Sequence, residues 1–501
     1  MAKYIMVQGT MSGVGKSLIV AALCRIFRQD GYSVAPFKSQ NMALNSYITR
    51  DGLELGRAQA VQAQAAGKEP DVRMNPILLK PSSDTGSQLI VHGEVRGDYL
   101  AASYFKLKKS LIPELLADFN SLAAENDIIV IEGAGSPAEI NLREDDIVNM
   151  GFAELVNAPV ILVGDIDPGG VFAQLYGTAA LLEKHERARI VGMIINKFRG
   201  DIEILRPGLR MLEEKCRLPV LGVVPYTNVD IDDEDSLSPR LKATAHHRVI
   251  DIAVIRLPHI SNFTDFSPLE RHDALGVRYV SSVSALGTPD MLILPGTKNT
   301  MADLEWLRSS GLESAVKKLA GEGVPVLGVC GGYQMLGRTL SDPDGVEHGG
   351  SMAGMGLLPC DTVFAPQKTR SRVTANCRGA KLDCYEIHMG VTDTNGAEPF
   401  AVLSNGRKEG AVRENVCGTY LHGLFDSGEL TRILADTLIK RKGLDENSAS
   451  VETHRDYLER QFDILADAVR NNIDMAAVYS AMDRFSKGER TNDRADQAIG
   501  N

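Results

Sequence analysis

Short apolar runs alternate with amphipathic helical patterns over the first 235 residues of the chain. Such alternation is typical of βαβ units and of a mostly parallel sheet. The runs are apolar throughout rather than alternating with polar residues, as strands are when helices cover both faces of their sheet. We therefore expect six strands here, at residues 3–8, 33–37, 128–132, 159–165, 190–196 and 220–224.

A second α/β series follows, with strands expected at 251–256, 277–280, 291–294 and 324–329, and then a glycine-rich, more β-like region from about 350 to 420. Between the two series, residues 230–247 contain an acidic run and no apolar periodicity, which indicates an interdomain linker. An acidic active-site loop is the alternative for this stretch. Beyond residue 440, apolar positions from Tyr457 to Val478 recur at helical spacing, and the polar residues from Ser486 predict a frayed tail.

The pattern predicts an α/β protein with two doubly wound parallel-sheet domains. We place the first domain at residues 1–235 and the second at 250–440, joined by a linker at 236–249. A C-terminal helical extension occupies residues 441–501.

Composition excludes several classes of protein. The 501 residues are 44% hydrophobic and carry a net charge of −11, without a basic stripe or tail that would bind nucleic acid. Apolar runs stay far below the ~20 residues of a membrane span, and the N-terminus lacks a signal peptide's apolar region. We expect a cytoplasmic protein. The seven scattered cysteines contain no Cys-x-x-Cys pair, so we expect mostly buried thiols rather than disulfides or zinc ligands.

A glycine-rich loop follows the first expected strand and precedes an amphipathic helix. Glycines such as Gly13 and Gly15 let backbone N–H groups face phosphate oxygens, Lys16 supplies a positive charge, and the Ser17 hydroxyl can bind Mg²⁺. The alternative is a glycine-rich turn that binds no nucleotide. Five residues separate Gly9 from Gly15, one more than the standard P-loop has, and this longer loop resembles the dethiobiotin synthetase branch of P-loop proteins.

Three carboxylates end neighbouring apolar strands and are candidates to hold Mg²⁺, which prefers oxygen ligands. Glu132 is the first choice, followed by Asp165 and Asp167, because ligands of open α/β folds bind at the carboxyl edge of the sheet. Capping or turn carboxylates are the alternative for each. Asn196, at the end of another strand, is a candidate contact for the adenine of ATP.

A cysteine stands between glycines, directly after an apolar strand and before a helical pattern. This context predicts a sharp turn that exposes Cys330 as a nucleophile, with the Gly331 N–H in an oxyanion hole. Gly296, in a Pro-Gly-Thr loop after the preceding strand, is the candidate second donor. A thiolate needs an imidazole to move its proton, and His422 is the first choice, with His388 as the other contender.

These segments resemble a class I glutamine amidotransferase domain over about residues 250–440. The usual His-x-Glu pattern is absent, since Leu424 follows His422 by two positions. That departure matches the subgroup that amidates cobyrinic and cobyric acids, and Glu386 is a candidate to orient the histidine instead. Segments 8–17, 36–46 and 132–141 closely resemble the cobyric acid synthase family, and the likeness runs through nearly the whole chain.

The resemblance implies a reaction. With ATP and Mg²⁺, and with L-glutamine as nitrogen donor, the b, d, e and g carboxylates of adenosylcobyrinic acid a,c-diamide would be amidated to adenosylcobyric acid, in cobalamin biosynthesis. Candidate corrinoid contacts are Lys38, Asn41, Asn45 and Lys80, which lie in polar segments after βα elements. Ordinary solvated loop residues are the alternative for each of them.

Two other functions remain open at this point. A cobyrinic acid a,c-diamide synthase would have the same two activities in the same order, although segments 36–46 and 132–141 favour cobyric acid synthase. A partitioning-type P-loop ATPase with a non-catalytic second domain would have no need of Cys330 and His422. Glutaminase activity distinguishes this last function from the other two.

Overall fold

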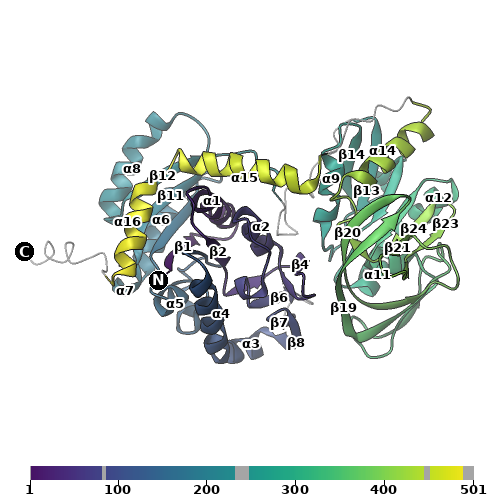
Figure 1. Cartoon of the computed structure of the whole chain (residues 1–501), viewed down its shortest axis with the longest axis horizontal. Helices are drawn as coiled ribbons and strands as arrows, with labels where there is room; N and C mark the ends of the chain where they lie inside the picture. The colour runs from purple at the N-terminus through teal and green to yellow at the C-terminus, as the bar shows by residue number, and fades with distance from the viewer. Residues whose placement is uncertain (1, 82–85, 232–247, 445–451, 489–501) are drawn as a thin grey trace, which may run out of the picture. The chain divides into compact units, whose positions relative to one another are not determined.

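The computed structural model describes residues 2–81, 86–231, 248–444 and 452–488 (Figure 1). The chain divides into two compact units. The first contains the chain up to Met42, Leu55–Ile231 and the chain from Leu458 onward. The second contains Ala43–Glu54 and the described chain from residue 248 to Tyr457. Most of the predicted linker at 236–249 lies outside the described residues.

A six-stranded parallel sheet forms the centre of the first unit, in the order β12-β11-β10-β1-β9-β2. Its strands are β1 (Lys3–Gly9), β2 (Val34–Phe37), β9 (Ile128–Glu132), β10 (Val160–Asp165), β11 (Ile190–Phe198) and β12 (Val220–Pro225). Each lies within two residues of a predicted strand. Because β9 and β10 flank β1, their carboxyl ends lie on either side of the loop that follows β1.

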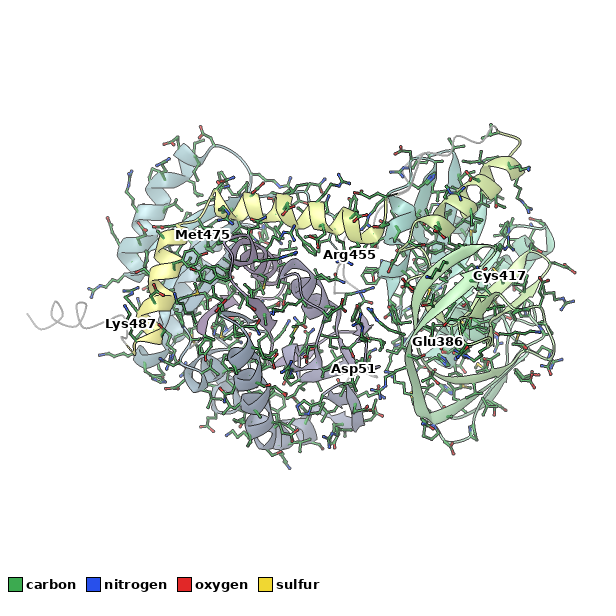
Figure 2. The ribbon with its side chains drawn as sticks, in the orientation of Figure 1. Asp51, Glu386, Cys417, Arg455, Met475 and Lys487 are labelled. Atoms are coloured by element: carbon green, nitrogen blue, oxygen red, sulfur yellow. The ribbon has the colours of Figure 1, made fainter. Side chains whose placement is uncertain are left out.

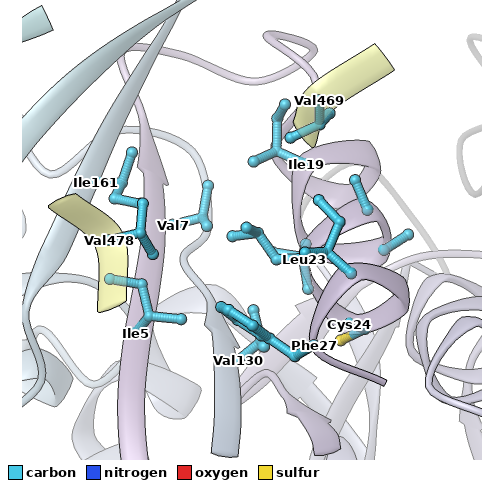
Figure 3. Packing of buried hydrophobic residues seen from close by; sticks show 14 of the residues in the cluster. Ile5, Val7, Ile19, Leu23, Cys24, Phe27, Val130, Ile161, Val469 and Val478 are labelled. Carbon is cyan, nitrogen blue, oxygen red and sulfur yellow. The ribbon is translucent and has the colours of Figure 1, made fainter. Parts of the chain in front are cut away.

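Helices cover both faces of this sheet, as the uniformly apolar strands predict. On one face, Ile5 and Val7 pack in a buried cluster with α1 (Lys16–Gln29), as Figure 3 shows. On the other, Met6 belongs to a second cluster. That cluster contains residues of α4 (Ile112–Glu125), α5 (Met150–Leu155), α6 (Val171–Leu181) and α8 (Ile202–Cys216). The doubly wound α/β fold predicted for this part of the chain is confirmed.

From Leu458 onward, the two last described helices belong to the core of the first unit. Val469 on α15 (His454–Arg470) and Val478 on α16 (Met475–Ser486) lie in the same cluster as Ile5 (Figure 3). The prediction set residues 441–501 apart as an extension, whereas the compact units assign the chain from Leu458 to the first unit. Most of the predicted tail after Ser486 lies outside the described residues.

A small four-stranded sheet, which the sequence analysis did not predict, completes the first unit. It contains β3 (Gln40–Met42), β6 (Ile77–Pro81), β7 (Gly86–Val91) and β8 (Glu94–Leu100). Shorter elements accompany it: α2 (Arg57–Ala65), η1 (Val72–Met74), α3 (Ala101–Leu107), η2 (Lys108–Leu111), η3 (Ile140–Asp145) and α7 (Lys184–Arg187). In the described part of the chain, no helix combines the length and the apolar character that crossing a bilayer requires.

The second unit also has a six-stranded sheet, in the order β14-β13-β15-β16-β24-β23, and only β23 among these strands is antiparallel. Its strands are β13 (Ile250–Ile255), β14 (Leu275–Val280), β15 (Met291–Leu294), β16 (Val326–Val329), β23 (Ala411–Arg413) and β24 (Val416–Thr419). Its helices are η5 (Phe263–Phe266), α9 (Ser267–Glu270), α10 (Val283–Leu286), α11 (Thr300–Ser309), α12 (Leu312–Gly321), α13 (Gly331–Leu336) and α14 (Glu429–Arg441).

A second, mostly antiparallel sheet occupies the region that the sequence marked as β-like. Its strands are β17 (Thr339–Asp342), β18 (Gly350–Ala353), β19 (Asp361–Cys377), β20 (Ala380–Asp393), β21 (Ala401–Leu403), β22 (Lys408–Glu409) and β25 (Leu421–His422). The long β19–β20 hairpin turns at Arg378 and Gly379, both with positive φ, as a two-residue hairpin loop requires. In the last strand, β25, His422 pairs with Tyr385 of β20.

Candidate functional site

The loop after β1 has the conformation of a phosphate-binding loop. Gly13 and Gly15 have φ of 78° and 95°, a left-handed region that favours glycine. A Cβ on Gly9 would lie 2.5 Å from Val14 Cγ2, and one on Gly15 would lie 2.3 Å from Asn196 Nδ2. The glycines therefore let the loop close tightly and enter α1, whose N-terminus presents unpaired N–H groups to an anion.

Lys16 lies within this loop. Its ammonium donates to the carbonyl oxygens of Met11, at 3.0 Å, and of Gly135, at 3.1 Å. Met11 belongs to the loop itself, and Gly135 belongs to the glycine-rich turn that follows β9. The positive charge is thus held where the β and γ phosphates of a nucleotide bind in P-loop proteins.

Glu132, at the end of β9, is a buried carboxylate beside the loop. Its Oε1 accepts hydrogen bonds from Ser17 Oγ at 2.8 Å and Lys38 Nζ at 3.0 Å, and its Oε2 accepts one from the Gln62 amide. Burial alone would raise the pKa of Glu132, but Lys38 and Gln62 lower it below its usual range. The carboxylate is therefore ionised, and with the Ser17 hydroxyl it offers the hard oxygen ligands that Mg²⁺ prefers.

The predicted site residues on β10 and β11 support the loop from its other side. Asp165 accepts a hydrogen bond from Lys197 Nζ at 2.7 Å, and the same ammonium donates to Gly13 O at 2.7 Å. Asn196 Nδ2 donates to Val14 O at 2.9 Å. The Asn196 amide thus positions the loop backbone, while its predicted contact with adenine stays a prediction.

The four candidate corrinoid residues are all buried, at 1–6% exposure. The alternative interpretation, that they are solvated loop residues, is therefore wrong. Lys38 pairs with Glu132, as described above. Asn41 donates to Gln59 Oε1 at 3.0 Å, and Lys80 lies in β6. Asn45 lies in the segment that belongs to the second unit. Lys38, Asn41 and Lys80 belong to the first unit, where the strands of Asn41 and Lys80, β3 and β6, are hydrogen-bonded neighbours.

Cys330 lies between β16 and α13 with a strained backbone, at φ 51° and ψ −109°. A Cβ on Gly332 would lie 2.0 Å from Leu294 O, and one on Gly331 would lie 2.7 Å from Thr297 Cγ2. Glycine at both positions lets the turn approach the loop after β15 closely. This is the strand-to-helix turn that the sequence predicts, and it brings the two candidate oxyanion loops together.

His422 is oriented by a carboxylate that the sequence analysis missed. Its Nδ1 lies 2.6 Å from Asp265 Oδ2, and the Gly423 N–H donates to Asp265 Oδ1 at 3.2 Å. His422 and Asp265 are 1% and 4% exposed. Burial alone would lower the pKa of His422, but Asp265 and Cys330 raise this pKa to about 10. The imidazole is therefore held as a cation next to the thiol.

Gly296 and Cys330, which the sequence also predicts to be in this site, lie close to His422 and its neighbouring strand. A Cβ on Gly296 would lie 3.5 Å from Cε1 of His422, and the Cys330 thiol lies 3.5 Å from the Ile387 carbonyl oxygen. Asp265, Gly296, Cys330 and His422 follow β13, β15, β16 and β24, which are adjacent in the sheet. Parallel neighbours end at one edge, so four distant segments converge on one site.

Glu386 and His388, the other two residues proposed to act with or in place of His422, contact other groups instead. Glu386, labelled in Figure 2, does not orient His422: it accepts hydrogen bonds from Ser371 Oγ, at 3.1 Å, and from Arg407. His388 contacts the Gly390 carbonyl through Nδ1 at 2.7 Å, and burial lowers its pKa to about 4. His388 is therefore neutral, and His422 is the imidazole placed to exchange a proton with the thiol.

The other cysteines have the environment of structural thiols, as expected. Cys24, Cys216, Cys360, Cys377 and Cys384 are buried. Cys417, labelled in Figure 2, is half-buried, and burial of its thiol raises its pKa to about 12. Cys330 differs from these thiols because it lies beside the imidazole of His422, which Asp265 orients.

Comparison with known proteins identifies two domains in the chain. Residues 5–238 match the CobQ/CobB/MinD/ParA nucleotide binding domain, and residues 251–430 match the CobB/CobQ-like glutamine amidotransferase domain. A cobyric acid synthase of Ruminiclostridium cellulolyticum is 54% identical, over 96% of this chain and 98% of its own. Proteins of the same name from Lachnoclostridium phytofermentans and Yersinia enterocolitica are 56% and 52% identical, over 96% and 95% of this chain and 99% and 98% of theirs.

Proposed function

Because the chain belongs to the cobyric acid synthase family, we propose that it amidates the b, d, e and g carboxylates of adenosylcobyrinic acid a,c-diamide to give adenosylcobyric acid. The nitrogen comes from glutamine and the driving force from ATP. The single observation that carries the proposal is the presence, in one chain, of a P-loop beside an ionised carboxylate and a cysteine beside an oriented imidazole. A partitioning-type ATPase would leave the second site unexplained.

The second unit releases ammonia from glutamine. The Cys330 thiolate attacks the carboxamide carbon, and the N–H groups of Gly331 and Gly296 stabilise the oxyanion that forms. His422 donates its proton to the departing ammonia, which leaves a thioester on Cys330. Water then attacks the thioester and gives its proton to His422, and the sulfur leaves as the thiolate, which releases glutamate and restores the starting pair. Asp265 holds the imidazole orientation throughout.

The first unit activates the carboxylate that will be amidated. A carboxylate does not condense with ammonia unaided in water, so the γ-phosphoryl group of ATP is transferred to it and gives an acyl phosphate. Lys16 balances the charge of the transferred group. Ser17 and Glu132 would hold Mg²⁺, which when bound supplies further charge neutralisation on the phosphates. Ammonia then displaces phosphate from the acyl carbon to form the amide.

The corrinoid brings several carboxylates and amides to the first unit. Lys80, on β6, and Asn41, on β3, are the candidate contacts, because β3 and β6 are hydrogen-bonded neighbours in the small sheet. The Asn41 side chain also donates a hydrogen bond to Gln59. We expect the reaction in the cytoplasm, where ATP and glutamine are plentiful.

Mass spectrometry of the products tests the proposal. Purified protein, ATP, Mg²⁺ and glutamine are incubated with adenosylcobyrinic acid a,c-diamide and, separately, with cobyrinic acid. The proposal predicts a gain of four amides on the diamide. Amidation of cobyrinic acid that stops at the a and c positions would identify a cobyrinic acid a,c-diamide synthase instead, and no amidation of any corrinoid would contradict the family-based function.

A further inference from the structure

The segment Ala43–Glu54 lies in the first half of the sequence but packs within the second unit. The chain on either side of it, up to Met42 and from Leu55, belongs to the first unit. The segment contains β4 (Ser46–Ile48), and most of its residues from 43 to 49 are buried. We call Ala43–Glu54 the strap.

The strap is anchored to the β19 strand by charged and polar contacts. Lys368 Nζ lies 2.6 Å from Glu54 Oε2, an ion pair in which the Glu54 side chain is fully buried. Arg372 Nε donates to Ile48 O at 3.1 Å, and its guanidinium lies 4.8 Å from the Tyr47 ring centroid. A buried ion pair needs its partner, so these contacts fix one position for the strap.

Asn45 of the strap binds directly to the turn that carries the triad carboxylate. Its Oδ1 accepts a hydrogen bond from the Asn262 N–H at 2.7 Å, and both residues are buried. Asn262 has φ 52°, a strained conformation for a residue other than glycine, and its carbonyl accepts the Asp265 N–H at 3.0 Å. The strap therefore satisfies the backbone donor of a turn that ends on Asp265.

The same turn also reaches His422 by a second route. Asn262 Nδ2 donates to the Tyr385 hydroxyl at 2.9 Å, and the Tyr385 ring stacks on His422 with centroids 5.1 Å apart. Ile48 of the strap forms a buried apolar cluster with Tyr385 and Ile387. The Ile387 carbonyl accepts a hydrogen bond from the Cys330 thiol. Strap contacts thus reach each of the three triad residues through one intermediate side chain or turn.

We propose that the strap positions the glutaminase triad, with Asn45 and Ile48 as positioning residues for Asp265, His422 and Cys330. Glutamine hydrolysis then depends on a segment that the first half of the sequence supplies. This proposal assigns Asn45 to the glutaminase site, whereas its sequence context predicts a corrinoid contact. It rests on the proposed glutamine hydrolysis, not on the identity of the corrinoid.

Glutamate release by the full-length protein, without corrinoid, tests the proposal. Asn45→Ala and Ile48→Ala should each lower kcat at least tenfold. Asn45→Asp, which keeps an acceptor oxygen, should recover most of the activity. Asp51→Asn, an exposed change in the same strap, should stay within twofold of the unsubstituted chain (Figure 2). Two separate variants keep the test decisive if one of them does not fold.

The pH profile separates positioning from a general loss of folded protein. The charged or titratable groups that face His422 from the elements around it include Asp265, Cys330, His388 and the stacked Tyr385. If the strap sets the His422–Asp265 contact, the alkaline limb of kcat should move to lower pH in Asn45→Ala. A drop by one factor at every pH, or unchanged glutamine hydrolysis with a raised KM for the corrinoid, would overturn the proposal. Absence of corrinoid amidation by the unsubstituted chain would contradict the proposed function while leaving this test intact.

Discussion

The imidazole Nδ1 of His422 lies 2.6 Å from the carboxylate of Asp265, although the two residues are 157 positions apart in the sequence. This contact completes a Cys330–His422–Asp265 arrangement, in which Leu424 stands where the usual His-x-Glu pattern has its glutamate. A buried carboxylate in this position holds the tautomer of the imidazole and stabilises its protonated form.

Asp265→Asn should lower glutamine-dependent amidation about 10²–10⁴-fold, since the amide keeps the shape of the side chain but not its charge. Amidation with free ammonia should stay within threefold, because it bypasses the thiol. Glu386→Gln is the matched control. The Glu386 carboxylate contacts Ser371 and Arg407, so removing its charge should change glutaminase activity less than threefold. The reverse ranking of these two variants would refute the assignment of Asp265.

Protonated His422 should stabilise the protein in a pH-dependent way. Its pKa rises from 6.5 in the unfolded chain to about 10 in the folded one, so the folded state binds this proton more tightly. The contribution is fully present below pH 6.5 and is lost as pH rises toward 10. Urea unfolding of the unsubstituted chain and of His422→Gln should give a difference of a few kcal/mol at pH 6, shrinking steadily by pH 10. A difference that grows with pH would contradict the imidazolium assignment.

Lys16→Ala should lower both glutamine-dependent and ammonia-dependent amidation at least ~100-fold, because both need the activated carboxylate. Glutamate release measured without ATP should be unaffected, since the Lys16 ammonium donates to carbonyl oxygens in loops of the first unit. Lys184→Ala, an exposed change on α7, serves as the control and should leave all three rates unchanged. Selective loss of the glutamine-dependent reaction in Lys16→Ala would show that the P-loop has another role.

Met482→Ala should destabilise the first unit by about 2–5 kcal/mol, because the side chain is fully buried in the cluster shared with α1 and β1. Met211→Ala, at a methionine that is 58% exposed on α8, should change the free energy of unfolding by less than about 0.5 kcal/mol. Equal stability of the two variants, measured by urea unfolding, would show that α16 is dispensable for this core.

Local motifs made much of this architecture predictable. The P-loop and the Cys330 turn are each specified by a few consecutive residues whose glycines have one evident purpose. Strand ends located Glu132 and Asp165 as well, because β9 and β10 flank β1 and parallel strands end at one edge.

Relationships that depend on distant segments were not predictable in this way. Asp265 follows β13 in a short helical turn, and its sequence context resembles that of any buried capping residue. Glu386 lies on the strand that pairs with β25, so it was a reasonable candidate, yet its carboxylate contacts Arg407. The strap falls within the domain predicted at residues 1–235, whereas packing places it in the second unit. The predicted helical extension was set apart from both domains, whereas its residues from Leu458 pack in the first unit.

The nitrogen-donor dependence of Cys330→Ala tests whether Cys330 is the nucleophile that takes ammonia from glutamine for amide synthesis. Purified Cys330→Ala and unsubstituted protein are supplied with ATP, Mg²⁺, adenosylcobyrinic acid a,c-diamide and either glutamine or ammonium chloride, and the corrinoid mass is followed. We predict four amides from either donor with the unsubstituted chain, and four from ammonia but none from glutamine with the variant. Normal use of glutamine by Cys330→Ala would show that Cys330 is not the nucleophile of glutamine hydrolysis.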